Sequence, residues 1–257
     1  MSNFLNLPAG YNLIVLDSVG STNDELKRRA LTEFADEGLA IWARMQTAGK
    51  GRNKRHWVSE VGNMFISVLF RPNRGMTEAA QLGFLPAIAA SKTLEYLVGQ
   101  LPELRYKWPN DLLLNKKKIG GTLLEVGFDQ KTGQDWVVVG FGLNLNHFPS
   151  TMLFPATSIK DELGDELEIE EVVELYLQNL AELYSSWQRT GFGPVREKWL
   201  AYGHVIDEPL SVKFGKEHIS GLFCDLDIKG GLVIETNNGP RRISVGDVYF
   251  APITGEF

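Results

Sequence analysis

Residues 46–57, QTAGKGRNKRHW, combine glycines with cations in a way that suits binding of an anion. Gly49 and Gly51 let the backbone bend closely around a ligand, and positive side chains alternate with them: Lys50, Arg52, Lys54 and Arg55. This segment, called the basic loop below, therefore indicates handling of phosphate or of nucleic acid. The alternative is a solvated basic surface loop. The sequence contains neither GxxxxGKS/T nor GxGxxG, so an ordinary nucleotide-binding fold is not indicated.

A second dense segment, residues 106–126 (YKWPNDLLLNKKKIGGTLLEV), is typical of a β-hairpin with a basic turn. Asn110 and Asp111 follow a proline and suit a bend. Lys118 lies where the turn re-enters the sheet, so we expect its ammonium group to be held over the same cleft as the basic loop. The two preceding residues fit solvated turn positions: Lys116 and Lys117.

Hydroxyl and amide side chains follow an apolar run near the start of the chain. Ser21, Thr22 and Asn23 come shortly after residues 13–16 (LIVL), which predict a buried strand. Thr22 with Glu25 three residues later predicts a capping box and a helix to about residue 34. Capping alone explains these residues in isolation, and only later motifs favour a binding role.

Residues 140–146, GFGLNLN, continue a predicted strand with two glycines that leave space for a ligand against the backbone. Asn144 and Asn146 alternate with leucines and therefore share one face of that strand. An asparagine amide both donates and accepts hydrogen bonds, so it can bind the edge of an adenine ring.

The elements that must position these residues follow from hydrophobic periodicity. Apolar runs predict strands at 13–16, 39–43, 63–70, 112–114, 119–126 and 136–139. Helical spacing predicts helices at 77–98, 169–187 and 194–201. We expect Thr77 to cap the first of these helices, and Pro86 to kink it or tighten its first turns. Helices that cover a sheet make this an α+β fold.

After residue 203 the periodicity changes from helical to strand-like, with turns at Gly215, at 230–231 and at 238–240. The pattern predicts a small β-barrel of about five strands. We therefore expect two domains, residues 1–203 and residues 204–257. Cys224 is expected to be buried in the barrel.

Composition excludes several classes of protein. The formal net charge of −6 argues against general nucleic-acid binding, so no DNA partner is expected. No apolar stretch is long enough to span a bilayer, and residues 1–10 do not resemble a signal peptide. A single cysteine excludes an internal disulfide, so we expect a cytoplasmic protein. The four histidines are scattered and form no metal-ligand pattern with the cysteine.

Taken together, these segments resemble the biotin protein ligases. The matching motifs are STND, the basic loop where that family has QxAGRGRxGRxW, KWPND followed by KKKIGG and LLE, and GFGLNLN. The resemblance runs from about residue 13 to residue 146 and implies a mixed-sheet catalytic domain like that of class II aminoacyl-tRNA synthetases and biotin–lipoate ligases. It also implies a C-terminal SH3-like barrel. Some members carry an N-terminal DNA-binding domain, whereas this chain is expected to start at the catalytic domain.

The resemblance implies ATP-dependent ligation of biotin to a lysine of a biotin carboxyl carrier protein through biotinyl-5′-AMP, with Mg²⁺. The residues implied in catalysis are Lys118, Arg52 and Asp111. Those implied in biotin binding are Ser21, Thr22, Asn23, Gln46, Gly49, Lys50, Gly51, Arg52, Lys118 and Gly121. Those implied in ATP binding are Arg52, Arg55, Trp57, Asn110, Lys118 and Asn144. No metal ligand is assigned, and either a monomer or a homodimer is expected.

Three differences from the family fall in the basic loop: Lys50 replaces an arginine, Asn53 replaces another polar or basic residue, and Lys54 replaces a glycine. A lysine keeps the positive charge but loses the bidentate geometry. Two alternatives stay open. A lipoate or octanoate ligase or transferase on the same fold would need a plain apolar tunnel, and a non-catalytic biotin-binding module would not need Lys118.

Overall fold

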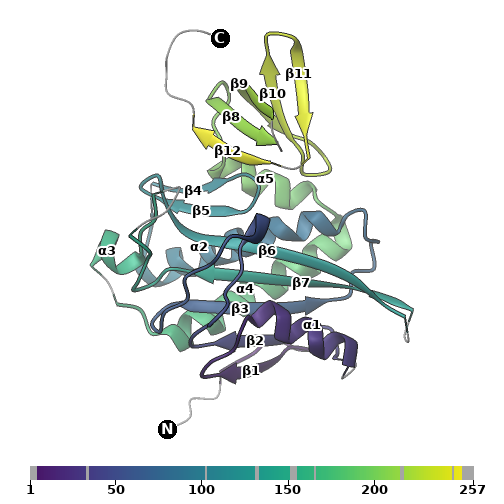
Figure 1. The fold of residues 1–257 in the computed structure, drawn as a ribbon, viewed down its shortest axis with the longest axis vertical. Helices are drawn as coiled ribbons and strands as arrows, with labels where there is room; N and C mark the ends of the chain where they lie inside the picture. Colours follow the sequence, from purple (N-terminus) through teal and green to yellow (C-terminus); the bar gives the residue numbers. More distant parts are fainter. Residues whose placement is uncertain are drawn as a thin grey trace.

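The computed structural model describes residues 5–32, 35–101, 103–130, 133–150, 155–164, 166–214, 217–244 and 246–250. Its larger part is a seven-stranded mixed sheet with the strand order β1-β2-β3-β7-β6-β5-β4 (Figure 1). Only β1 and β2 pair in parallel. The strands are β1 (Asn12–Leu16), β2 (Leu39–Ala43), β3 (Met64–Phe70), β4 (Leu104–Lys107), β5 (Asp111–Leu114), β6 (Lys117–Asp129) and β7 (Gln134–Leu143).

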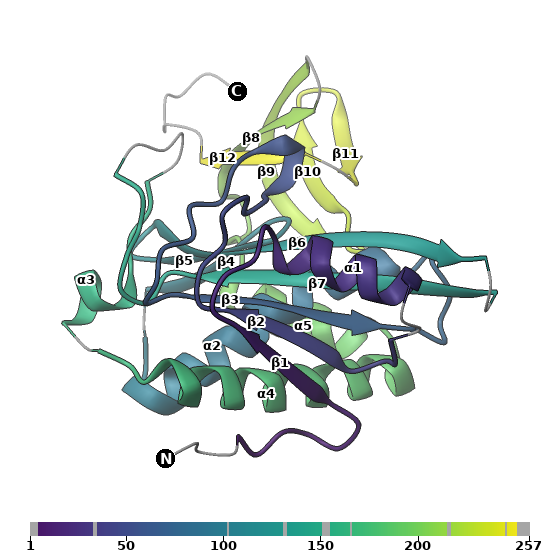
Figure 2. The same cartoon turned by 60° about the horizontal axis from the view of Figure 1, so that its bottom comes forward.

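Helices cover both faces of this sheet unequally. Figure 2 shows α1 (Thr22–Thr32) on one face, while α2 (Leu85–Val98) and α4 (Ile169–Thr190) run along the other. The large core lies under α2 and α4, whereas α1 packs on a small apolar cluster. Because α1 covers only part of its face, the rest of that face remains available for a site. The short helix α3 (Ile159–Leu163) and α5 (Gly193–Tyr202) complete the helices.

The strand predictions are confirmed, whereas the first long helix differs from its prediction. A 3₁₀ helix, η2 (Ala79–Phe84), precedes α2, and Pro86 lies in the first turn of α2. Proline lacks an N–H group and its ring would clash with the carbonyl four residues earlier, so the α-helix cannot extend back through Leu82. The expected tightening at Pro86 is therefore confirmed. Thr77 does not cap the helix, because Glu78 holds the N-cap position of η2.

The chain then forms a five-stranded antiparallel sheet with the order β11-β10-β9-β8-β12 (Figure 1). Its strands are β8 (Pro209–Phe214), β9 (Glu217–Leu226), β10 (Leu232–Thr236), β11 (Gly239–Ile243) and β12 (Asp247–Phe250). Cys224, expected to be buried here, is only half-buried. No described helix is long and apolar enough to cross a bilayer.

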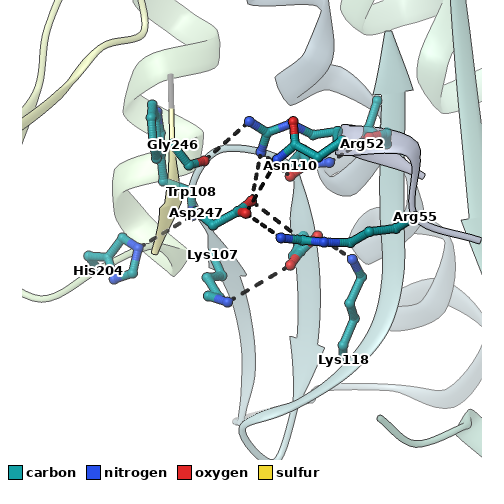
Figure 3. A network of polar contacts seen from close by, with 12 residues as sticks. Arg52, Arg55, Lys107, Trp108, Asn110, Lys118, His204, Gly246 and Asp247 are labelled. Atoms are coloured by element: carbon teal, nitrogen blue, oxygen red, sulfur yellow. Dashed lines mark hydrogen bonds and ion pairs between the residues drawn. The ribbon is translucent and has the colours of Figure 1, made fainter. Parts of the chain in front are cut away.

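Two hydrogen bonds join the second sheet to the bend between β4 and β5. Trp108 donates its indole N–H to the carbonyl oxygen of Gly230 at 2.9 Å, and its backbone N–H to Nε2 of His204 at 3.3 Å (Figure 3). Trp108 and His204 are both buried. The smaller sheet is therefore seated directly beside the KWPND bend.

Candidate functional site

A cavity of about 430 Å³ opens on the sheet face that α1 covers only in part. Residues from the start of α1, the basic loop, the β4–β6 segment, β7 and β12 line it. It brings together most of the residues singled out in the sequence: Ser21, Thr22, Asn23, Gln46, Lys50, Gly51, Arg52, Arg55, Trp57, Asn110, Asp111, Lys118 and Gly121. These residues are separated by up to about a hundred positions in the chain, and the sheet places them on one surface.

Uncharged polar side chains form a hydrogen-bonded chain at the α1 side of the cavity. Gln46 Oε1 accepts from the backbone N–H of Thr22 at 2.9 Å and lies 3.1 Å from its hydroxyl oxygen. Gln46 Nε2 donates to the hydroxyl of Ser59 at 2.9 Å. The hydroxyl of Ser67, on β3, lies 2.7 Å from Thr22 Oγ1 and 2.6 Å from Asn23 Oδ1. The amide and hydroxyl groups are thereby fixed in orientation before any ligand binds.

The predicted capping box at the start of α1 is wrong. The helix begins at Thr22 itself, and the Thr22 hydroxyl bonds to Gln46 and Ser67. The Glu25 carboxylate accepts instead from two arginines of its own helix, Arg28 and Arg29. Thr22 and Asn23 are therefore turned toward the cavity by tertiary contacts and not by capping.

Glycines on β7 make room for two of the lining side chains. A Cβ atom at Gly140 would lie 2.0 Å from Asn23 Oδ1, and one at Gly142 would lie 2.5 Å from Cε2 of Trp57. Such distances are impossible for real atoms, so any side chain at either position would displace Asn23 or Trp57. These glycines were expected to leave space for a ligand. The space beside them is instead filled by Asn23 and Trp57, which line the cavity.

Cations and one carboxylate gather at the β5–β6 side. Lys118 Nζ lies 2.5 Å from Asp111 Oδ1 and 5.2 Å from the ring centre of Trp57. Lys107, on β4, is buried, and its ammonium is 4.0 Å from the other oxygen of Asp111. Burial lowers the pKa of Lys107, while the charge of Asp111 opposes that effect. The cavity therefore offers two ammonium groups that share one counter-ion.

The basic loop is folded as a tight finger. Gly51 donates its N–H to the carbonyl of Arg55 at 2.8 Å, and Trp57 donates to Gly49 at 2.9 Å. Asn53 and Lys54, at the tip, adopt left-handed backbone conformations with φ of 55° and 60°. A lysine is a costly residue in that conformation, which explains why a glycine is usual at position 54 in the resembling pattern.

The arginines of the finger reach the C-terminal sheet. Arg52 donates to Asn110 Oδ1 at 3.3 Å and to the carbonyl of Gly246 at 3.2 Å, and Arg55 forms an ion pair with Asp247 (Figure 3). Burial lowers the pKa of Arg52, although the nearby Asp247 and Asp111 raise it, and the guanidinium stays charged. The guanidinium groups of the loop are therefore held by acceptors that a bound anion could replace.

Two of the predicted residues do not line this cavity. A Cβ atom at Gly49 would lie 2.4 Å from the carbonyl oxygen of Trp57, so Gly49 is required by the packing of the finger. Asn144 is buried, donates to the carbonyl of Thr157 at 3.0 Å, and lines a separate small cavity beside Trp57 and Lys118.

The sequence did not single out Lys107 and Asp247, which line the cavity, or Ser67, which bonds to Thr22 and Asn23. Lys107 had a usable signal, because it is the first residue of the KWPND motif. Ser67 stands alone in an apolar strand. Asp247 lies about two hundred positions from the loop it contacts, and nothing local marks it. Among the residues that the structure describes, no group of three His, Cys, Asp or Glu is placed to hold a metal ion.

Comparisons with known proteins agree with this architecture. Residues 15–144 match the biotin/lipoate A/B protein ligase family, and residues 205–251 match the biotin protein ligase C-terminal domain. A biotin–[acetyl-CoA-carboxylase] ligase of Paracoccus denitrificans is 35% identical over 82% of this chain and 89% of its own length. The bifunctional ligase/repressor BirA of Bacillus subtilis is 30% identical over 93% of this chain and 74% of its own length.

Solved structures show the same fold. Biotin protein ligase from Aquifex aeolicus, in complex with biotin and ATP, superposes with a TM-score of 0.80 and 28% identity, covering 93% of this chain and 97% of that one. The similarity spans both sheets. This chain therefore belongs to the biotin/lipoate A/B protein ligase family and carries the C-terminal domain of the biotin protein ligases.

Proposed function

We propose that this protein ligates biotin to a lysine of a biotin carboxyl carrier protein or domain, using ATP and forming biotinyl-5′-AMP. One observation carries the proposal: a single cavity joins an oriented chain of uncharged hydrogen-bonding side chains to a cluster of cations. Biotin has a polar ureido ring at one end and a carboxylate at the other. The names of the relatives, which include biotin–[acetyl-CoA-carboxylase] ligase, support an acetyl-CoA carboxylase carrier as the acceptor.

In the first step a carboxylate oxygen of biotin attacks the α-phosphorus of ATP, and pyrophosphate leaves. Negative charge accumulates on the phosphate oxygens, so fixed cations lower the barrier more than they strengthen ground-state binding. Lys118 is our choice for the cation that bridges the biotin carboxylate and the α-phosphate, because it faces the cavity from β6. Arg52 and Arg55 would exchange Asn110 and Asp247 for phosphate oxygens.

In the second step the lysine amine of the carrier attacks the acyl carbon of the adenylate, and AMP leaves. The attacking amine must be neutral, so a nearby carboxylate can accept its proton or orient it. Asp111 is the carboxylate in the cavity that is proposed for this role, with a side chain 14% exposed between Lys118 and Lys107.

For biotin, we propose that Ser21, Thr22, Asn23 and Gln46 bind the ureido ring, with Ser67 fixing two of them. Lys50, Gly51 and Gly121 would line the path to the carboxylate. Gly121 suits that role because a Cβ there would lie 2.9 Å from Lys118 Nζ. Gly49 would contribute through the shape of the finger alone.

For ATP, we propose that Trp57 and Asn110 lie against the adenosine, with Asn144 in the adjoining small cavity. Asn144 serves that role only if adenine reaches past Trp57, since Trp57 and Lys118 separate the two cavities. Mg²⁺ would supply charge neutralisation on the phosphates. It usually binds through substrate phosphates with one or two carboxylates, and Asp111 in the cavity fits that chemistry.

The rival substrate class is lipoate or octanoate. Those acids carry no ureido ring, so they would bury the polar side chains of Gln46, Thr22 and Asn23 without forming hydrogen bonds to them, which is unfavourable for polar groups that face a ligand. Asn23 and Thr22 are buried. A non-catalytic biotin-binding module would not need the pair of Lys118 and Asp111.

We further propose that residues 1–203 and 204–257 are separate domains and that the reaction takes place in the cytoplasm. The five strands of the second sheet bond to each other and not to the first sheet. A chain with one cysteine suits a reducing compartment. Asp247 makes the second domain part of the cavity wall, so the carrier would be met by both domains.

Biotin-dependent exchange of labelled pyrophosphate into ATP tests the first step. No exchange above a blank without biotin would refute the proposal. Transfer of labelled biotin to a carrier domain tests the second step, with a carrier whose target lysine is replaced by arginine as the control. Parallel reactions with lipoate and octanoate decide between substrates, and faster transfer of either acid would favour the rival.

A further inference from the structure

We propose that Asp24 is a positioning residue whose carboxylate clasps Lys50 and so holds the basic loop against helix α1. Asp24 Oδ2 lies 2.5 Å from Lys50 Nζ. Asp24 does not line the cavity, whereas Lys50 does. Asp24 therefore lies outside the cavity and fixes Lys50, a loop residue that faces the cavity.

Further contacts connect the Asp24–Lys50 ion pair, called the clasp below, to the uncharged polar side chains of the site. The other oxygen of Asp24 lies 2.8 Å from Lys27, and Lys27 lies 2.5 Å from Glu125 on β6. Glu125 also accepts from the amide of Asn23 at 2.9 Å. A single series of contacts thus links the loop to a side chain proposed to bind the biotin ring.

Side chains, and not the backbone, attach the finger to the rest of the molecule. The loop's first residues are fixed by backbone bonds, from Thr47 to Val19 at 2.9 Å and from Ala48 to Gly20 at 2.7 Å. Within the described residues, the backbone hydrogen bonds of residues 49–55 stay inside the loop. The side-chain attachments include the clasp on α1, the arginine contacts with Asn110 and the C-terminal sheet, and a hydrogen bond from Asn53 to Asp247 at 3.4 Å.

The two attachments differ in what a nucleotide does to them. Arg52 and Arg55 are the residues proposed to bind phosphate, so ATP competes with Asp247 for them. Lys50 has three N–H donors and can keep Asp24 while it faces a ligand. The clasp is therefore an attachment that persists through the reaction, and it holds the loop against α1 when the arginines exchange partners.

Charge keeps the clasp formed at neutral pH. Burial by itself would raise the pKa of Asp24, but hydrogen bonds and charge from Lys27 and Lys50 hold that pKa below its ordinary value. The side chains of Lys50 and Asp24 are 45% and 42% exposed. An ion pair this exposed changes a local equilibrium by at most about fivefold, which is enough to matter for a loop that must open and close.

The test that needs no ligand is trypsin cleavage of the full chain, because the loop carries several cleavage sites: Lys50, Arg52, Lys54 and Arg55. Asp24→Asn should speed cleavage in the loop about threefold. The matched control is Glu25→Gln, on the same helix, which loses two arginine partners but does not touch the loop. Lys27→Gln removes the other partner of Asp24 and should leave cleavage of the loop unchanged.

Wild-type cleavage in Asp24→Asn would overturn the proposal. Equal acceleration in Glu25→Gln would also overturn it, because the effect would then come from a weakened helix. Asp24→Glu keeps the negative charge and should restore most of the protection against trypsin. Cleavage of the loop in Asp24→Glu as fast as in Asp24→Asn would contradict an electrostatic clasp.

A second measurement rests on the proposed function. With biotin and ATP present, Asp24→Asn should release about threefold more free biotinyl-AMP per biotin transferred, while pyrophosphate exchange stays near wild type. If wild type shows no exchange, the proposed function fails and the proteolysis result still decides the clasp. If exchange is present and release does not rise, the clasp is refuted and the proposed function stands.

Discussion

Lys118 Nζ and Asp111 Oδ1 lie 2.5 Å apart across the β5–β6 hairpin. The ladder of these two strands shifts register between Leu112 and Leu113, so the side chains of Asp111 and Lys118 are not simple cross-strand neighbours. The pair faces the cavity, with Lys118 over the ring of Trp57. A cation and a carboxylate therefore lie side by side in the cavity, and this makes Lys118 the first residue to test.

Lys118→Ala should cripple adenylation far more than it weakens biotin binding, because a cation contributes most where charge accumulates in the transition state. We expect a loss of roughly a hundredfold or more in pyrophosphate exchange. Calorimetry would report biotin affinity. Lys116→Ala, in the exposed hairpin turn, is the control and should behave as wild type. Normal exchange by Lys118→Ala would show that adenylation does not depend on this side of the cavity.

Arg52→Ala should weaken both biotin binding and retention of the adenylate, since its guanidinium joins the loop to Asn110 and to Gly246. Leakage is its expected signature, measured as free biotinyl-AMP released per biotin transferred. A control is Arg105→Ala, which loses an ion pair with Glu208 outside the cavity. Retention of the adenylate as in wild type would contradict the proposed closing of the loop.

Ser67→Ala should lower biotin affinity and stability together. The substitution leaves Asn23 Oδ1 without its hydroxyl partner in a buried position, which typically costs about 1–3 kcal/mol. Ser91→Ala is the matched control, because Ser91 is also buried and bonds through its hydroxyl to Tyr106, away from the cavity. Both variants should melt at lower temperature, but only Ser67→Ala should change the calorimetric affinity for biotin. An equal affinity in the two variants would remove Ser67 from the site.

Glu162 should make stability depend on pH in the acid range. Hydrogen bonds from Lys117 and Asn115 lower the pKa of Glu162 to about 2. Because the folded pKa lies below the ordinary value of 4.5, the stabilisation is fully present above that value and is lost as pH falls toward 2. The difference in melting temperature between wild type and Glu162→Gln should therefore be largest near neutral pH. It should shrink as the pH falls below 4.5 and disappear as the pH approaches 2.

The control for this prediction is Glu166→Gln, whose carboxylate pairs with Lys160 on the exposed surface. Solvent screens such a pair, so its removal should have a smaller effect on melting temperature. A gap for Glu162→Gln that stays constant from pH 7 to pH 3 would show that the hairpin turn does not depend on the charge of Glu162.

The sequence by itself predicted most of the helices and strands, though not β4 or α3, and most of the polar residues that line the cavity. Apolar runs and helical spacing are local signals, and they located strands and helices on both sides of residue 203. Motif residues such as Gln46, Lys118 and Asn23 were identifiable because their types suit anions and polar rings, and because their order resembles one family. The sequence identified each of these residues separately and did not give the distances between them.

Only the tertiary structure decided which of these residues meet and what holds them. Asn23 turns into the cavity because Ser67 on β3 and Glu125 on β6, two strands separated by β7, satisfy its amide. Asp247 reaches Arg55 only because the second sheet is seated beside the KWPND bend. Hydrogen bonds and ion pairs between distant segments have no local sequence signal, since each depends on the register and packing of the elements between them. The same reason explains the capping box, where a local pattern at Thr22 yielded to contacts with Gln46.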